Sequence, residues 1–145
     1  MHEHGIKNVL ASSGTSLTKN QIILVKRLTS NIVLLFDGDQ AGVSASLRSI
    51  DLILEEGLNV KICSFPEGDD PDSFVRKNKK EKMLEFINNE SKDFVDFKLS
   101  INKDFKDDED KKVSVIKNIL KSISLIPDTL KQEIYIKKLS AVLDI

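Results

Sequence analysis

The chain has 145 residues, of which 40% are hydrophobic and 31% are charged, a composition typical of a globular protein. Its single cysteine, Cys63, excludes a disulfide scaffold. The longest apolar run, residues 32–36, is far shorter than the roughly 18 residues of a membrane-spanning helix, so no such span is expected. The formal net charge of −1 gives little overall attraction for nucleic acid, which would require a local basic patch or a bridging metal ion.

The charged residues are unevenly distributed along the chain. Residues 1–66 carry six basic and six acidic side chains, and residues 67–145 carry the remaining sixteen and seventeen. The second stretch is rich in Lys, Asp and Asn, with apolar residues at helical spacing between them. This change in composition predicts two structural units, with a boundary near residues 67–90.

The first unit begins with alternating strand and helix signals. Residues 7–12 are typical of a short buried strand that ends in a turn of small residues. Thr18 is placed to cap a helix over residues 19–29, whose apolar positions form one stripe. Residues 31–36 predict a second strand, and their apolar character is that of a strand covered on both faces.

A helix is predicted over residues 43–56, ended by Gly57 in the C′ position, and a third strand over residues 58–65. The order strand, helix, strand, helix, strand predicts parallel strands joined by right-handed crossovers. In such a sheet, ligands bind beyond the carboxyl ends of the strands. Candidate functional residues are therefore sought at those ends.

Two acidic pairs follow two of the predicted strands. Asp37 and Asp39 come directly after the second strand, and Asp70 and Asp72 follow the third. Two carboxylates separated by one residue of extended chain point the same way, and a divalent cation such as Mg²⁺ would relieve their repulsion. The alternative interpretation is that these residues only form turns and helix caps, where Asp is common.

The second unit predicts helices and little chemistry. Apolar residues recur at helical spacing over residues 82–88 and 93–101. The acidic residues 107–110 favour a helix N-terminus, because carboxylates interact well with the positive end of the helix dipole. Pro127 breaks the helix that follows, and Asp128 can cap a last one. We expect a small helical bundle packed beside the α/β unit.

Three blocks of the sequence carry a family resemblance. Residues 33–42 resemble the hydrophobic strand and DxDxAG turn of the TOPRIM fold, which bacterial primases and topoisomerases share, and residues 5–18 and 65–77 resemble flanking segments of bacterial DnaG-type DNA primases. The resemblance implies an α/β fold: a TOPRIM-like parallel sheet flanked by helices, with its first strand missing, followed by a small helical bundle. It also implies a partial TOPRIM domain over residues 1–80 and a helical subdomain of the primase polymerase core over residues 81–145.

The same resemblance implies a function. DnaG-type primases synthesise short RNA primers on single-stranded DNA during replication, joining ribonucleoside triphosphates by metal-dependent nucleotidyl transfer. The family's DxD acids bind catalytic magnesium, which carries over to Asp37 and Asp39 as catalytic and metal-binding residues. The acids of its DPD motif carry over to Asp70 and Asp72 as further metal ligands. The implied cofactor is Mg²⁺ or Mn²⁺.

Four more residues are candidates for nucleotide binding. Gly14 and Thr15 follow the first predicted strand, beside the expected site, where a backbone or hydroxyl contact to phosphate competes with a plain turn or cap role. Arg76 and Lys77 follow the second acidic pair within about one helical turn, and could meet phosphate or remain solvated surface charges.

The resemblance leaves parts of a primase outside residues 1–145. A glutamate on the family's first TOPRIM strand would precede Met1, and the zinc-binding module, the basic polymerase subdomain and the helicase-binding domain have no counterpart here. The chain is interpreted as a fragment, inactive alone, of a cytoplasmic, nucleoid-associated bacterial enzyme. Its partners would be template DNA, ribonucleoside triphosphates and, through a domain absent here, the replicative helicase. An unpaired sheet edge predicts a fragment dimer or a rearranged sheet.

Two other classes of function remain as alternatives. Another TOPRIM protein, such as a topoisomerase or a nuclease, would also carry DxD acids at a strand end. A topoisomerase needs a tyrosine nucleophile, and the single tyrosine, Tyr135, falls in an apolar helical stripe. A non-enzymatic receiver-like domain would need one phosphorylatable aspartate and a lysine after a later strand, and phosphotransfer from a small donor would reveal it.

Overall fold

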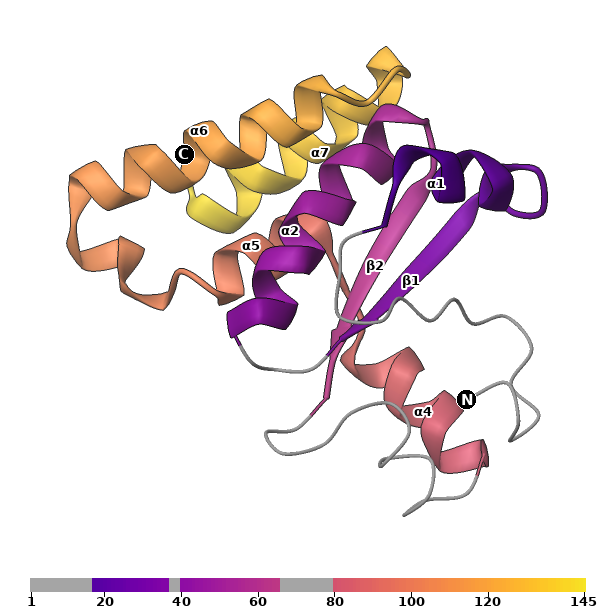
Figure 1. Cartoon of the computed structure of the whole chain (residues 1–145). Helices are drawn as coiled ribbons and strands as arrows, with labels where there is room; N and C mark the ends of the chain where they lie inside the picture. Colours follow the sequence, from indigo (N-terminus) through magenta and orange to yellow (C-terminus); the bar gives the residue numbers. More distant parts are fainter. Residues whose placement is uncertain (1–16, 37–39, 66–79) are drawn as a thin grey trace.

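The computed structural model describes residues 17–36, 40–65 and 80–145. Helices surround a small central sheet, and Figure 1 shows α2 lying across the strands, with α6 and α7 beyond it and α4 near the strands' carboxyl ends. The helical elements are α1 (Lys19–Lys26), α2 (Gln40–Glu55), α4 (Lys80–Glu90), α5 (Phe94–Ser100), the 3₁₀ helix η2 (Lys103–Asp107), α6 (Glu109–Ser124) and α7 (Thr129–Leu143).

The sheet has the strand order β1, β2, β3. β1 (Asn31–Phe36) and β2 (Asn59–Ser64) pair in parallel over their whole length, as the strand–helix–strand pattern predicts. The strands predicted over residues 31–36 and 58–65 are thus confirmed, and α2 forms the connection between them. A parallel pair joined by a helix places both carboxyl ends at one edge of the sheet.

The C-terminal end of α2 is set by hydrogen bonds at Gly57. Gly57 has φ +80, a left-handed conformation that glycine adopts without a Cβ clash. Its N–H donates to the Leu54 carbonyl at 2.9 Å, and the Leu58 N–H donates to the Ile53 carbonyl at 3.3 Å. These two bonds form a Schellman motif, which confirms Gly57 as the C′ residue. The helix predicted over residues 43–56 begins earlier, at Gln40.

The helix predicted over residues 19–29 is shorter than expected, because α1 ends at Lys26. Its start is confirmed: the Gln21 N–H donates to Thr18 Oγ1 at 3.2 Å, and the Thr18 N–H donates to Gln21 Oε1 at 2.9 Å, a reciprocal capping box. The residues after α1 turn into β1, and the Asn31 N–H donates to Thr29 Oγ1 at 3.2 Å.

One part of the predicted sheet needs correction. Lys92 and Asp93 form the short strand β3, although Asp93 was expected to begin a helix; β3 pairs antiparallel with β2 through Ile62 and Lys92. The described sheet is therefore mixed, not wholly parallel. The strand predicted over residues 7–12 lies outside the described residues, and the fragment dimer stays a prediction.

The helices predicted in the second half are confirmed as α4, α5, α6 and α7. Asp108 caps α6, accepting from the Asp110 N–H at 3.0 Å, and Asp128 caps α7, accepting from the Leu130 N–H at 2.9 Å. Lys138 on α7 bonds to the carboxylates of Asp93 and Asp96, which fixes α7 against α5.

The larger of two apolar clusters in the described residues joins both halves of the chain. Its members come from the strands, from α2 and from α5 to α7, so the helical part completes the core of the sheet. Among the described residues, no helix combines the length and the apolar character needed to cross a bilayer. Residues of the core are Ile32, Ile50, Ile53, Val60, Ile62, Phe94, Val95, Ile119, Ile123 and Leu139, among others.

Candidate functional site

The carboxyl ends of β1 and β2 lie side by side. Phe36 and Ser64 are partners in the parallel register, and the Phe65 N–H donates to the Phe36 carbonyl at 3.2 Å, which extends the pairing by one residue. Asp37 directly follows Phe36 in the sequence, and the segment that holds Asp70 leaves from the end of β2. Both acidic segments therefore start from one edge of the sheet, as the sequence predicts.

The predicted site residues themselves lie outside the described residues, so the structure gives no contacts for them. Within residues 17–36, 40–65 and 80–145, no cluster of three or more His, Cys, Asp or Glu could hold a metal ion. The chemistry of the predicted donor set nevertheless fits a divalent cation, because it consists of carboxylates on segments that share one sheet edge. The predicted site residues outside the described ranges are the carboxylates Asp37, Asp39, Asp70 and Asp72 and the nucleotide-binding candidates Gly14, Thr15, Arg76 and Lys77.

Aromatic contacts hold both strand ends in place. The Phe36 ring at the end of β1 meets Phe97 of α5 edge-on, with ring centroids 5.6 Å apart. After β2, the Phe65 ring stacks on Phe86 of α4 at 5.5 Å, beside the buried Met83. Each such aromatic pair contributes about 1 kcal/mol beyond its buried area. The carboxyl ends of β1 and β2, from which the acidic segments continue, are therefore held by packing against α5 and α4.

The N-terminus of α2 also belongs to this edge, because α2 begins at Gln40, directly after Asp39. Its first turn contains no acidic residue. The dipole of a helix N-terminus favours phosphate and other anions. A metal-bound polyphosphate near this edge would therefore meet a favourable field.

Two other reactive side chains have structural roles. Cys63 is buried in β2, and burial raises the pKa of its thiol to about 11, so the reactive thiolate is scarce at neutral pH. Tyr135 on α7 packs against Phe94 with ring centroids 4.7 Å apart, and burial, followed by the charge of Asp93, raises the pKa of its hydroxyl.

One unusual residue was not predicted from the sequence, the buried Lys98 of α5. A signal for it exists: Lys98 comes four residues after Phe94 and three after Val95, and residues at these spacings share one helix face. A lysine on the apolar face of a helix calls for a buried partner, and its partners come from distant parts of the chain.

Two family models match the chain. A Toprim-like model matches residues 1–75, and a model of the DnaB-helicase binding domain of primase matches residues 98–145. A DNA primase of Clostridium acetobutylicum is 40% identical over 144 residues, which are 97% of this chain and 24% of that protein. This chain thus spans about a quarter of that relative's length.

Solved structures agree with these matches. A DNA primase domain from Pseudomonas aeruginosa has a TM-score of 0.83 and 25% identity, over 99% of this chain and 46% of that one. A DnaG primase catalytic domain bound to single-stranded DNA has a TM-score of 0.81 and 26% identity, over 97% of this chain and 46% of that one. The chain belongs to the DnaG-type DNA primase family. A topoisomerase, a nuclease or a receiver-like domain is not favoured by these relatives.

Membership of the primase family confirms the resemblance and the α/β fold, but one expectation needs correction. The family's helicase-binding part was expected outside this chain, whereas the similarity to that domain extends over residues 98–145, from the end of α5 through α6 and α7. The amphipathic pattern of these helices does not by itself separate core packing from partner binding, because buried and partner-binding stripes have the same spacing.

Proposed function

We propose that this chain supplies the metal-binding edge of a DNA primase, an enzyme that makes RNA primers on single-stranded DNA by nucleotidyl transfer. The observation that carries the proposal is the in-register parallel pair of β1 and β2, from whose shared edge both acidic segments leave. The names of its relatives support the same activity. The partition into a TOPRIM part, residues 1–80, and a helical part, residues 81–145, belongs to this proposal.

In this proposal Asp37 and Asp39 bind the catalytic Mg²⁺ or Mn²⁺, and Asp70 and Asp72 hold metal from the neighbouring segment. When bound, the metal neutralises the charge of the triphosphate and stabilises the leaving pyrophosphate. The carboxylates of this chain orient the metal, and the N-terminus of α2, at Gln40, adds a favourable field for phosphate.

The remaining candidates bind the substrates. Gly14 and Thr15 offer a backbone N–H and a hydroxyl to phosphate, and Arg76 and Lys77 offer cations. A solved relative bound to single-stranded DNA supports a DNA template as the second substrate. Because the chain spans 24% of a DNA primase relative, we propose that it acts as one part of that enzyme and is inactive alone. In this proposal the enzyme works at the nucleoid in the bacterial cytoplasm.

Manganese binding tests the proposal. Crystals of the chain soaked in Mn²⁺ should show an anomalous peak within about 2.0–2.3 Å of oxygens of Asp37 or Asp39, because Mn²⁺ takes the oxygen ligands of Mg²⁺. The Asp37→Asn variant should lose most of that peak. Ordered Asp37 and Asp39 side chains with no peak between them, or a peak only at the acids of residues 107–110, would contradict the proposal.

We also propose that α5, α6 and α7 contact the replicative helicase. The match of residues 98–145 to a helicase-binding family supports this, and so do Leu130 and Ile134, one turn apart on α7, which are 64% and 57% exposed. Serine at both positions should weaken co-sedimentation with the helicase at least tenfold, since each apolar side chain buried contributes about 1.5–3 kcal/mol. Leu24→Ser on α1 is the matched control, and equal loss in both variants would contradict the contact.

A further inference from the structure

A buried lysine lies where three helices meet. Lys98 of α5 is 4% exposed, and its ammonium donates to Asn118 Oδ1 and to Ser122 Oγ of α6, both at 2.7 Å. Burial lowers the pKa of this ammonium, and the Asp51 carboxylate opposes that shift. A charge in such a position is tolerated only with well-placed partners.

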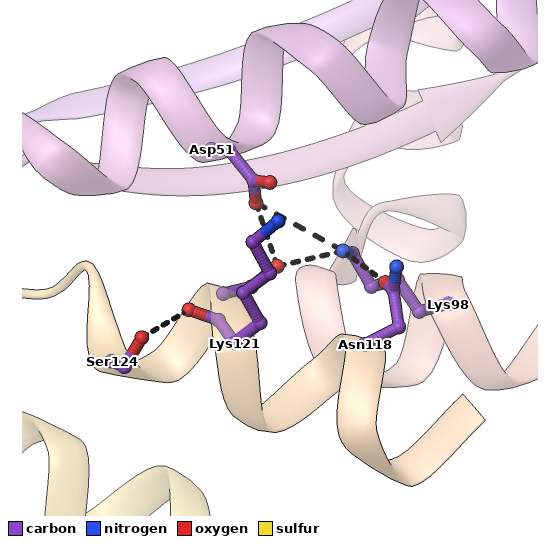
Figure 2. Close-up of polar contacts among 6 residues, drawn as sticks. Asp51, Lys98, Asn118, Lys121 and Ser124 are labelled. Carbon is purple, nitrogen blue, oxygen red and sulfur yellow. Dashed lines mark hydrogen bonds and ion pairs between the residues drawn. The ribbon is translucent and has the colours of Figure 1, made fainter. Parts of the chain in front are cut away.

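The charged partner of Lys98 is Asp51 of α2. Ser122 Oγ donates to Asp51 Oδ1 of α2 at 2.6 Å, and Lys98 Nζ lies 3.9 Å from the same oxygen. Figure 2 shows the side chains of α2, α5 and α6 converging on this point. The hydroxyl of Ser122 thus accepts from Lys98 and donates to Asp51, which links the three helices through one atom.

This arrangement is not a serine–lysine nucleophile, although the 2.7 Å bond would suit one. Ser122 is only 1% exposed, so no substrate reaches its oxygen. Its hydrogen is directed to Asp51, away from the lysine that would have to accept it. The function of the cluster must therefore be sought in how it holds the helices.

Polar contacts hold α2 at several points: the Leu17 N–H donates to Ser49 Oγ at 3.1 Å, the Gly57 N–H caps its C-terminal end, and the bond from Ser122 to Asp51 joins it to α6. Ile50 and Leu54, on either side of Asp51, belong to the same apolar core as Ile119 and Ile123 of α6. Apolar burial is non-directional, so it places α2 against α6 less strictly than a hydrogen bond does. A buried hydrogen-bonded charge has strict distance and angle requirements, and therefore permits one register.

We propose that Lys98 is a positioning residue that sets the axial position of α2 and hence of its first residue, Gln40. The helix steps from Asp51 back to Gln40 span about 16 Å, and a continuous α-helix transmits an axial shift along its length. Because Gln40 directly follows Asp39, the lysine controls the metal-binding edge from a distance. This consequence for metal binding rests on the proposed function.

The first test needs no metal. In the Lys98→Met variant, which keeps the length and packing of the side chain, the amide NMR signals of residues 40–43 should shift or broaden as strongly as those of residues beside position 98. The matched control is Lys117→Met, which removes an exposed lysine from the same helix that holds Asn118. If the Lys98→Met spectrum changes only near residue 98, the lysine merely stabilises the core and the inference is wrong.

The second test measures Mn²⁺ affinity by electron paramagnetic resonance, at a temperature where every variant is folded. Lys98→Met should weaken Mn²⁺ binding at least fivefold, and Lys117→Met less than twofold. Asp37→Asn separates the two proposals. If it binds Mn²⁺ normally while residues 40–43 still move in Lys98→Met, the proposed function fails and the positioning of α2 stands. If only Asp37→Asn weakens binding, control of the metal edge by Lys98 is overturned.

A second variant covers the case in which Lys98→Met does not fold. Ser122→Ala removes the bridging hydroxyl but keeps the bond from Lys98 to Asn118. It should produce the same signal changes at residues 40–43, with a smaller loss of Mn²⁺ affinity. Wild-type signals at those residues in folded Ser122→Ala would overturn the inference.

Discussion

Replacing Asp37 by asparagine in the full-length protein is expected to lower primer synthesis by about a thousandfold, with little change in the midpoint of thermal unfolding. The amide has the shape of the carboxylate but no charge, so it is a poor ligand for a hard divalent cation. Loss of metal-based stabilisation of the transition state by about 4 kcal/mol corresponds to that factor. Incorporation of labelled ribonucleotides on a single-stranded template measures it.

The matched control for this substitution is Asp104→Asn, which makes the same change at an exposed acid of η2. Primer synthesis by this variant should stay within twofold of the wild-type rate. Because a weakened site fills at higher metal concentration, excess Mn²⁺ should restore part of the activity of Asp37→Asn. An Asp37→Asn enzyme that keeps more than a tenth of the wild-type rate would remove Asp37 from the metal site.

The elements that could be predicted from the sequence are those with strong local signals. The apolar run of β1 favours a strand, although Val33 is 43% exposed, so this strand is not covered on both faces as predicted. Gly57 ends α2 because its φ of +80 suits glycine. The caps Thr18, Asp108 and Asp128 mark helix starts within one residue. In each case the deciding contact is made by residues close together in the chain.

The features that escaped prediction depend on residues far apart in the sequence. β3 consists of two polar residues whose pairing with β2 bridges a long separation, and no pattern of two residues reveals a strand. The contact of Lys98 with Asp51 likewise joins two distant helices. Tertiary packing decides such contacts, and the sequence around Lys98 shows only that a lysine interrupts an apolar face.

The candidate site was predicted in two separate steps. The convergence of the strand ends follows from the alternation of strands and helices, and the register of Phe36 with Ser64 confirms it. The assignment of the acids to primer synthesis instead required the family resemblance, because a pair of carboxylates at a strand end occurs in several enzyme classes. The positions of the acid side chains stay a prediction that the Mn²⁺ experiment addresses.

The largest effect on stability is expected at Phe94, whose replacement by alanine should lower the free energy of unfolding by about 3–5 kcal/mol. The Phe94 side chain is fully buried and packs at a tilt against Tyr135 of α7. Phe94 is the first residue of α5, directly after β3. Its removal leaves a cavity at the point where the sheet meets the helical part. Urea unfolding followed by circular dichroism gives the value, and an unchanged m-value shows that the native state keeps its compactness.

The control for Phe94→Ala is Leu24→Ala on α1, where the side chain is 59% exposed and its truncation should cost less than about 1 kcal/mol. A cost below 1 kcal/mol for Phe94→Ala would contradict the packing of Phe94 in the core.

The shape of the unfolding transition carries a further expectation. Because one core includes β1, β2 and the helices α5 to α7, Phe94→Ala should shift a single cooperative transition, not split it in two. The helices α5 to α7 then fold as one unit with the sheet, and Lys98 can position α2 because both belong to that unit.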